Sequence, residues 1–382
     1  MGIYEEILTE KKAYIEEIWT KLDQKLRLVA ERNRDKLPHS AVDGVFDDLS
    51  EIAPEGWTNG FWPGMMWLMY AGTEAEVYKV TAIRGEELLE AATEDFENLH
   101  HDVGFMWHIS SGVHYRLLGD KAAKSRAMYM AASLASRYNM KTGCIRAFPD
   151  QARERMVIID SMMNIPLLYW ASEVTQDPRF SLIAQAHADT CLQNHKRGDG
   201  SFYHILEYDI HTGECLGGVH GQGARIDGEA VKGSWSRGQA WAVYGYALSY
   251  RYTGRQEYLD AAKQVANYFI ACVSQTGYIP AYDFRQAYDC KDIDTSAGAI
   301  AASGLIEIAQ LVPEYEKPLY LNAVLKMVEA MTENYCDFSA ETDPIMTGCA
   351  ISAAALDKPV IFGDFYYVQT IYKLMGFKDL FW

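Results

Sequence analysis

The chain has 382 residues, of which 49% are hydrophobic, and a formal charge of −17 at pH 7. This length and apolar content are enough for one large domain or two ordinary ones. The negative charge opposes binding to nucleic acids and to anionic membrane surfaces, so we expect neither as a partner.

The sequence also lacks the patterns of export and membrane insertion. Its first thirty residues are rich in charge and contain no apolar stretch of the kind found in signal peptides. No apolar run approaches the roughly 18 residues needed to cross a membrane. The seven cysteines are scattered from Cys144 to Cys349 without a C-x-x-C pair, which is typical of reduced thiols. The sequence therefore predicts a cytoplasmic protein.

Helical patterns follow one another in pairs along the chain. In each pair an apolar segment, rich in small and aromatic residues, precedes a more polar, amphipathic one. A segment that is apolar nearly all round is typical of a helix buried on both sides, and its partner has the single polar face of an outer helix. In chain order the pairs are 60–70 with 74–94, 103–118 with 121–138, 160–174 with 177–195, 235–252 with 255–271, and 295–311 with 314–335.

The two end segments complete this pattern. The apolar segment 363–375 has no partner after it, and the amphipathic segment from about residue 4 to residue 32 has none before it. If these two pair with each other, six inner and six outer helices close into a ring. The sequence therefore predicts an all-α fold, an (α/α)6 toroid, in preference to an open α-solenoid. No linker-like change of composition interrupts the chain, so we expect one domain over residues 1–382.

Two intervals between helical segments, 197–234 and 336–362, are longer than the others. Because they are rich in Gly, His and residues that favour β-structure, we expect loops and short hairpins over one mouth of the toroid. Binding residues concentrate in such loops.

Two aspartates open neighbouring inner helices in this arrangement. Asp102 and Asp160 lie 58 residues apart, about one repeat, which places both carboxylates at the same mouth. Glycosidic cleavage usually needs one protonated and one ionised carboxyl group, and a close pair can shift each other's pKa. The commoner role of an aspartate at this position is to cap the helix, and a helix N-terminus favours the charged form. From these residues alone, either role is open.

Histidines accompany this pair of carboxylates in the sequence. His100 and His101 precede Asp102, and His204 and His220 lie in the interval predicted to cover the mouth. A metal site of His and Asp ligands is the alternative, but the helix spacings H-x-x-x-H and H-E-x-x-H do not accompany them. We therefore expect no metal and no other cofactor.

Aromatic and cationic side chains offer further binding groups. Trp57, Trp62 and Trp67 bracket the first inner helix, and Trp57, in a Thr-Asn-Gly turn, is expected to be the most exposed. Arg237 and Trp241 are four residues apart and share one face of a helix. They predict either a cation–π pair in the wall or a clamp for a sugar carboxylate.

Several long motifs now identify a resemblance. They read HDVGF at 101–105, IDSMMNIPLLYWAS at 159–172, WSRGQAWAVYGYALSYRYTG at 235–254, DTSAGAIAASGL at 294–305 and FGDFYY at 362–367. Together they resemble the unsaturated glucuronyl hydrolases of glycoside hydrolase family 88, in order and over essentially the whole chain.

The resemblance implies an (α/α)6 barrel and a hydration reaction. Its substrate would be an oligosaccharide, left by a polysaccharide lyase acting on a glycosaminoglycan or a similar polymer, that ends in a 4,5-unsaturated uronic acid. Asp160 matches the general acid, which would protonate C4 and then draw a proton from the water that attacks C5. Asp102 would remain ionised, and Arg237 would pair with the sugar carboxylate. The residues that would line the sugar subsite are Trp57, His101, His204, His220, Gln222, Arg237 and Trp241.

Other functions remain open at this point. The related unsaturated rhamnogalacturonyl hydrolases share the fold and the chemistry, but WSRGQAW at 235–241 fits the glucuronyl group better. A sugar 2-epimerase on the same toroid would use histidines such as His204 and His220 as its acid–base pair. A non-catalytic carbohydrate-binding protein would not need Asp102 or Asp160 for binding. The sequence leaves the preferred lyase product, its sulfation and the oligomeric state open.

Overall fold

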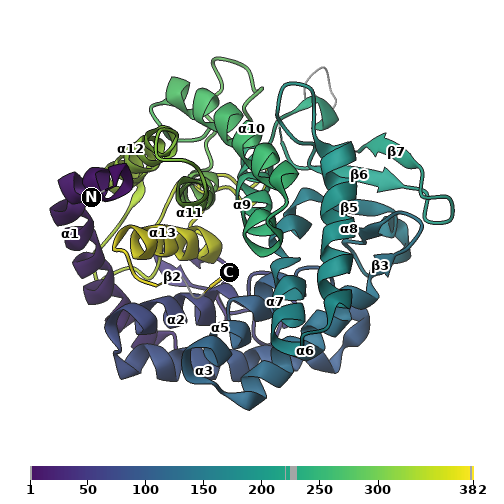
Figure 1. The fold of residues 1–382 in the computed structure, drawn as a ribbon. Coiled ribbons are helices and arrows are strands. Elements are labelled where there is room, and N and C mark those ends of the chain that lie inside the picture. Colours follow the sequence, from purple (N-terminus) through teal and green to yellow (C-terminus); the bar gives the residue numbers. More distant parts are fainter. Residues whose placement is uncertain (1, 220, 224–229, 379–380) are drawn as a thin grey trace.

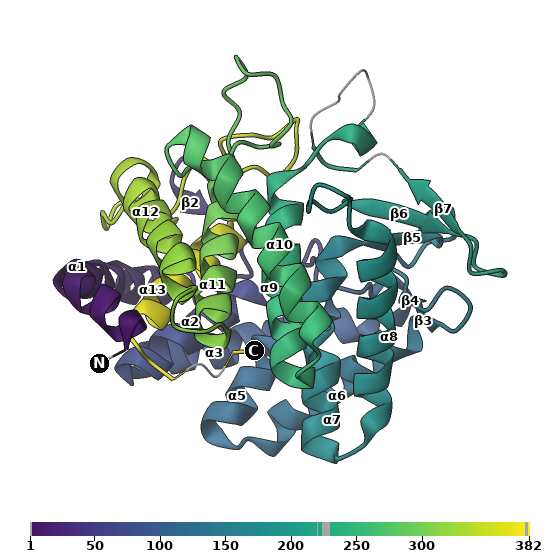
Figure 2. The ribbon, with the colours of Figure 1, turned by 45° about the horizontal axis from the view of Figure 1, so that its top comes forward.

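Inner and outer helices alternate along the chain and close into a two-layered ring (Figures 1 and 2). The computed structural model describes residues 2–219, 221–223, 230–378 and 381–382. The outer layer consists of α1 (Ile3–Arg32), α3 (Glu76–Leu89), α6 (Lys121–Ser136), α8 (Pro178–His195), α10 (Gln256–Val273) and α12 (Lys317–Tyr335). The inner layer consists of α2 (Phe61–Thr73), α4 (Val103–His108), α5 (Ser111–Leu118), α7 (Pro166–Thr175), α9 (Ser236–Thr253), α11 (Thr295–Leu311) and α13 (Ile361–Leu374). The predicted all-α fold and the (α/α)6 toroid are confirmed.

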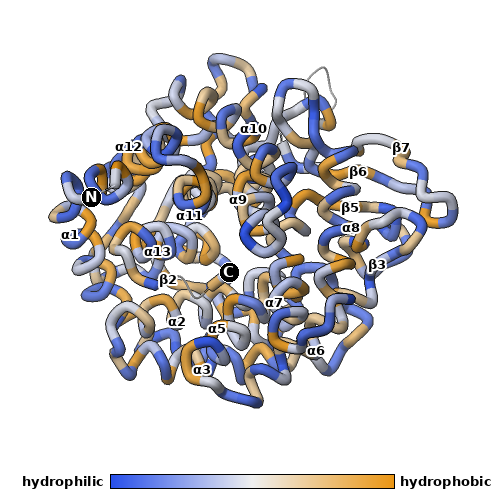
Figure 3. Tube along the Cα trace, in the orientation of Figure 1, coloured by the Kyte–Doolittle hydropathy of each residue, from blue (hydrophilic) through white to orange (hydrophobic). Residues whose placement is uncertain are grey.

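The two layers differ in burial as their sequences predict. Every residue of α13 is buried, and so is α9 from Ser236 to Ser249. The outer helices instead bury one stripe, and hydrophobic and hydrophilic positions alternate along them in Figure 3. Inner helices pack on one another and on their outer partners, so the apolar core is continuous around the ring. None of the described helices is long and apolar enough to cross a membrane.

Glycines allow neighbouring inner segments to approach at backbone distance. A Cβ atom on Gly104 would lie 2.4 Å from the Cα atom of Asn164, and one on Gly245 would lie 2.5 Å from the Cβ atom of Met162. Real side chains do not come that close, so only glycine fits at these two junctions. The second, third and fourth inner segments are therefore fixed relative to one another.

Helix α1 closes the ring. It packs against α12 and α13 as well as α3, so the first and last helices of the chain lie side by side (Figure 1). Trp19 of α1 contacts the rings of Tyr372 and Phe377 at 6.2 Å and 5.2 Å between centroids. Ion pairs join Lys11 to Glu329 at 2.5 Å and Arg32 to Asp343. The pairing predicted for the two end segments is confirmed.

The structure corrects two predicted inner helices. The segment 103–118 is interrupted at Ile109 and Ser110, which separate α4 from α5. The segment 160–174 begins as the 3₁₀ helix η4 (Ile159–Met163), and α7 starts only at Pro166. Proline lacks an N–H group and clashes with the carbonyl group four residues earlier, so one α-helix cannot run through this point. As a result, Asp160 does not open an α-helix.

Short strands and 3₁₀ turns connect the helices. A three-stranded antiparallel sheet contains β5 (Met156–Ile158), β6 (Ile205–Tyr208) and β7 (Cys215–Gly218), so the interval 197–234 contains a hairpin as predicted. The other hairpins pair β1 (Ala41–Val42) with β2 (Val45–Phe46) and β3 (Tyr138–Asn139) with β4 (Cys144–Ile145). The remaining 3₁₀ turns are η1 (Glu90–Glu94), η2 (Phe96–Asn98), η3 (Gln151–Arg153), η5 (Ala230–Lys232) and η6 (Ser274–Thr276).

Candidate active site

A cavity of about 360 Å³ is lined by residues of α9, η4 and β6 and of the loops around them. The two long loops predicted to cover the mouth both contribute, through Gln222 and Ile351. A second cavity, of about 530 Å³, lies beside the segment 279–293 and contains none of the predicted site residues. His220 lies outside the described residues. The eight other predicted site residues all line the first cavity: Trp57, His101, Asp102, Asp160, His204, Gln222, Arg237 and Trp241.

Asp102 occupies the N-cap position of α4, but its carboxylate makes no capping hydrogen bond. Oδ1 instead accepts from Nδ2 of Asn164 at 2.9 Å, and Oδ2 lies 3.1 Å from Nδ1 of His100. Nε2 of His101 is 3.4 Å from Oδ1. Burial alone would raise the pKa of Asp102, but the neighbouring imidazoles, His101 first, outweigh it and hold this pKa well below its usual range. Asp102 is therefore ionised, and the capping role is excluded.

Asp160 lies on η4 and has the opposite electrostatic surroundings. Its Oδ1 atom is buried without a hydrogen-bond partner among the described residues, and Nε2 of His204 is 3.9 Å away. Burial, followed by the negative charge of Asp102, raises the pKa of Asp160 to about 7, against a smaller opposing effect of Arg237. About 23% of the side chain remains exposed, so the carboxyl group can be reached from the cavity. Asp160 therefore keeps its proton up to about neutral pH, whereas Asp102 is ionised.

His204 faces this carboxyl group as a neutral donor. Its Nδ1 atom accepts a hydrogen bond from the backbone N–H of Gln222 at 2.8 Å, so the ring proton lies on Nε2, the atom nearer Asp160. Burial, with a smaller contribution from Arg237, lowers the pKa of His204 to about 3. Gln222 is held in turn by Tyr282, whose hydroxyl donates to its Oε1 at 2.8 Å.

One guanidinium nitrogen of Arg237 is hydrogen-bonded to the wall of the cavity. Nη1 donates to Asp294 at 2.5 Å and also to the carbonyl oxygen of Ala350. The guanidinium lies over the rings of Trp235 and Phe362, at 4.6 Å and 5.0 Å from their centroids. Of the two alternatives left open for Arg237 and Trp241, the cation–π pair is not formed. The aromatic partners of Arg237 are Trp235, the N-cap residue of the same helix, and Phe362 of α13.

Three tryptophans line the cavity, and two of them, Trp57 and Trp241, were predicted to do so. Trp241 is 1% exposed and packs against Phe105 at 5.1 Å between ring centroids. Trp57 is half-buried and packs on Phe362 at 4.9 Å, whereas Trp62 and Trp67 are fully buried. The expectation that Trp57 is the most exposed of these three is confirmed.

Sequence reasoning assigned no role to several residues at this site. His100 and Asn164 contact the Asp102 carboxylate directly, and Phe148 and Trp235 line the cavity. Asn164 belongs to the motif at 159–172, in which Asp160 was the only residue given a catalytic role. Phe148 lies between helical segments, where no periodic pattern marks it.

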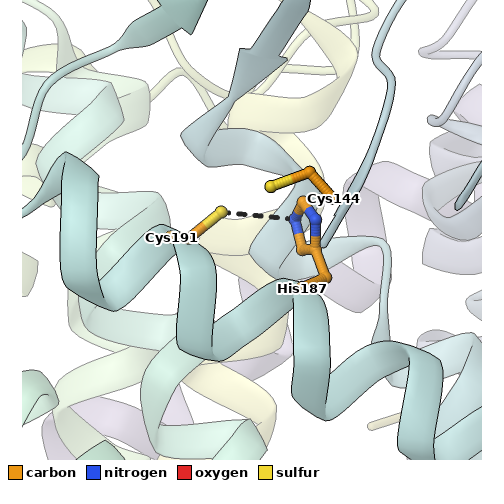
Figure 4. Close-up of side chains that lie close together, drawn as sticks. All are labelled: Cys144, His187 and Cys191. Atoms are coloured by element: carbon orange, nitrogen blue, oxygen red, sulfur yellow. Dashed lines mark hydrogen bonds between the residues drawn. The ribbon is translucent and has the colours of Figure 1, made fainter. Parts of the chain in front are cut away.

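The group of described residues that could surround a metal ion is Cys144, His187 and Cys191, whose ligand atoms all lie within 4.8 Å of one another (Figure 4). However, Nδ1 of His187 accepts the backbone N–H of Ile145 at 3.0 Å, so the neutral ring carries its proton on Nε2. Nε2 lies 2.6 Å from the Oγ atom of Ser161 and therefore donates there. A protonated nitrogen cannot bind a metal. The cluster instead connects α8 to the residue that follows Asp160.

Comparisons with known proteins agree with this fold. Residues 29–379 match the family described as Glycosyl Hydrolase Family 88. The unsaturated glucuronyl hydrolase of Bacillus sp. (strain GL1) is 34% identical over 356 residues, which cover 89% of this chain and 91% of that protein. The unsaturated chondroitin disaccharide hydrolase of Streptococcus pneumoniae (strain ATCC BAA-255 / R6) is 30% identical over 380 residues, which cover 96% and 94%.

Solved structures extend the likeness to three dimensions. The crystal structure of unsaturated glucuronyl hydrolase from Streptococcus agalactiae superposes with a TM-score of 0.88 at 28% identity, covering 97% of this chain and 94% of that one. The enzyme from Bacillus sp. GL1 gives 0.86 at 30% identity, covering 94% and 97%. The resemblance inferred from the sequence motifs is therefore confirmed, and the chain belongs to glycoside hydrolase family 88.

Proposed function

We propose that this glycoside hydrolase removes the terminal 4,5-unsaturated uronic acid from oligosaccharides that polysaccharide lyases release from glycosaminoglycans or similar polymers. The observation that carries the proposal is the pair of half-buried carboxyl groups, lining one cavity, whose pKa values are shifted in opposite directions: that of Asp160 is raised to about 7 and that of Asp102 is lowered. The names of relatives support the substrate class: they include an unsaturated glucuronyl hydrolase and an unsaturated chondroitin disaccharide hydrolase.

The chemistry follows from the protonation states of the two groups. Protonated Asp160 donates its proton to C4 of the sugar, and positive charge develops at C5 and the ring oxygen. Water then adds to C5 and returns a proton to the Asp160 carboxylate, so the acid is regenerated. The hemiketal formed at C5 opens, which releases the sugar as a keto-aldehyde and frees the next residue. Ionised Asp102 stabilises the positive charge in the transition state.

The remaining cavity residues bind and orient the sugar. The Nε2–H group of His204 points toward Asp160 and donates to substrate or to the attacking water. Arg237 keeps Nη2 for the sugar carboxylate, because this nitrogen has a single long bond, 3.3 Å to the carbonyl oxygen of Ile351, among the described residues. Trp57 and Trp241 supply apolar surface on which a sugar ring packs.

The proposal is tested by following the ultraviolet absorbance of the C4=C5 bond in unsaturated disaccharides. We expect the wild-type enzyme to remove the absorbance and Asp160→Asn to be slower by at least about 10²-fold, the usual contribution of a general acid. A panel that includes chondroitin, hyaluronan, heparin and rhamnogalacturonan products ranks the substrates.

The matched control is Asp364→Asn. Asp364 is also buried, and burial also raises its pKa to about 7, but it accepts backbone N–H groups of Ile345 and Met346 and does not line the cavity. Its variant should retain activity per folded molecule. If no unsaturated uronide loses its absorbance with wild-type enzyme, the proposed function is wrong.

We also propose that residues 1–382 form one catalytic domain that works in the cytoplasm. Closure of the ring by α1 against α12 and α13 supports the single domain. The proposed cytoplasmic location rests on the seven cysteines, which are scattered along the chain and are free thiols in the structure.

A further inference from the structure

Asn164 connects the segment of Asp102 to the segment of Asp160 through its side-chain amide. It follows η4 directly, and it is 1% exposed. Its Nδ2 atom donates to Oδ1 of Asp102 at 2.9 Å and lies 3.4 Å from the backbone carbonyl oxygen of Asp160. Its Oδ1 atom accepts the backbone N–H of Phe105 at 2.7 Å. Each polar atom of this side chain therefore has a partner.

The bond to Phe105 replaces one that Asp102 would ordinarily make. Asp102 is the N-cap residue of α4 and Phe105 is the third residue of that helix. An N-cap carboxylate normally accepts the N–H group of the second or third helical residue. Here the side chain of Asn164, from a different segment, takes that N–H group. The Asp102 carboxylate is therefore free to face the cavity.

Backbone packing fixes this arrangement. Because a Cβ atom on Gly104 would lie 2.4 Å from the Cα atom of Asn164, the start of α4 and the end of η4 are in direct contact. Small movements of either segment would change the bonds that Asn164 makes.

We propose that Asn164 is a positioning residue: it caps α4 in place of Asp102 and holds the freed Asp102 carboxylate, in its ionised form, beside Asp160. The part of this inference that concerns catalysis rests on the proposed function. Asn164 does not line the cavity, so it acts through Asp102 rather than on the substrate.

The charged and titratable groups around the pair define what a change at Asn164 does. Asp102 faces His100, His101 and, at longer range, Arg137. Asp160 faces Asp102, Arg237 and His204. Removing the Asn164 donor raises the pKa of Asp102, because one bond to the ionised form is lost.

The first experiment compares pH profiles of kcat/KM for Asn164→Ala and Asn164→Asp. Asn164→Ala should lower kcat on the order of 10²-fold with little change in KM, because a misplaced catalytic group slows the chemical step. Asn164→Asp keeps an oxygen for Phe105 but adds a negative charge, so the basic limb of its pH profile, which Asp160 sets, should move to higher pH.

The control is Asn33→Asp, the same change at another 1%-exposed asparagine, whose Nδ2 donates to the carbonyl oxygen of Val29. It should lower the melting temperature without moving the pH profile. If the Asn164 variants lose activity only in proportion to folded protein, and their profiles match wild type, the proposal is overturned.

The second experiment does not depend on turnover. Urea unfolding midpoints are measured for wild type, Asn164→Ala, Asp102→Asn and the double variant. We expect Asn164→Ala to lower the unfolding midpoint by less in the Asp102→Asn variant than in the wild type, because the bond to an ionised carboxylate is already absent there. Additive shifts would contradict the role of Asn164. If the wild-type enzyme does not turn over unsaturated disaccharides, the proposed function is contradicted, but the structural role of Asn164 is not.

Discussion

Asp102 and Asp160 carry the same functional group, and their surroundings alone make them different acids. Two imidazoles and an amide donor face the Asp102 carboxylate, whereas Oδ1 of Asp160 has no hydrogen-bond partner among the described residues. The difference is maintained because each group affects the other: the charge of Asp102 helps to keep the proton on Asp160. This division of roles is what acid-catalysed hydration requires.

The pKa of Asp160 predicts how activity depends on pH. The protonated carboxyl group is the active form, so kcat/KM should fall as pH rises through about 7, where burial and the charge of Asp102 place this pKa. Initial rates on an unsaturated disaccharide between pH 5 and pH 9 measure this limb. Activity that keeps rising to pH 9 would exclude Asp160 as the acid.

Replacement of Asp102 by asparagine should lower the pKa of Asp160. The negative charge that helps to raise it is lost, while the effect of burial remains. We therefore expect the basic limb of the pH profile to move to lower pH, together with a lower kcat from the loss of transition-state stabilisation. The same series of initial rates measures both effects. An unmoved basic limb would show that burial alone sets the pKa of Asp160.

Among the helices, Glu86 of α3 connects both layers of the ring. It accepts hydrogen bonds from Trp67 of α2, Ser111 of α5 and Arg126 of α6, each at 2.8 Å, and it is 2% exposed. Glu86→Ala leaves the Arg126 charge and buried donors without this partner, so we expect a loss of about 3–5 kcal/mol in unfolding free energy. Urea denaturation measures it.

The neighbouring Glu87 provides the comparison. It is exposed and pairs with Arg84 on the same helix at 3.1 Å, so Glu87→Ala should cost less than about 1 kcal/mol. Glu86 does not line the cavity, and folded Glu86→Ala should keep its turnover. Equal losses in the two variants would mean that Glu86 does not join the layers.

Helical periodicity was enough to predict the order and the pairing of the helices, because an inner helix and an outer helix bury different faces. It could not predict the break at Ser110 or the 3₁₀ start at Ile159, since contacts between inner segments help to set both. Pro166 was a visible signal for the second of these. The motifs located Asp102 and Asp160. The bonds of Asn164, however, reach 59 and 62 residues along the chain and depend on how two neighbouring inner segments pack against each other.

The charge of the whole molecule should affect how substrate binds. At −17 the protein repels an anionic sugar at long range, and salt screens that repulsion. Between 0.01 M and 0.15 M ionic strength the Debye length falls from about 30 Å to about 8 Å, so KM for an unsaturated disaccharide should fall. Its uronate methyl ester, which lacks the charge, should show no such change. A KM that rises with salt would mean that attraction by local cations such as Arg237 outweighs the long-range repulsion by the net charge.

Closure of the ring also joins residues that are synthesised far apart in time. Lys11 of α1 and Glu329 of α12 are 318 residues apart in the chain. A ribosome that adds about 5–20 residues per second needs roughly 15–60 s to make that stretch. During this interval the apolar stripe of α1, which includes Leu22 and Leu26, cannot pack against α12 and α13 because these helices have not yet been synthesised. We therefore expect chaperones to bind the exposed apolar stripe of the nascent helix. A circular permutant that places this helix after α13 would shorten the time for which the stripe is exposed.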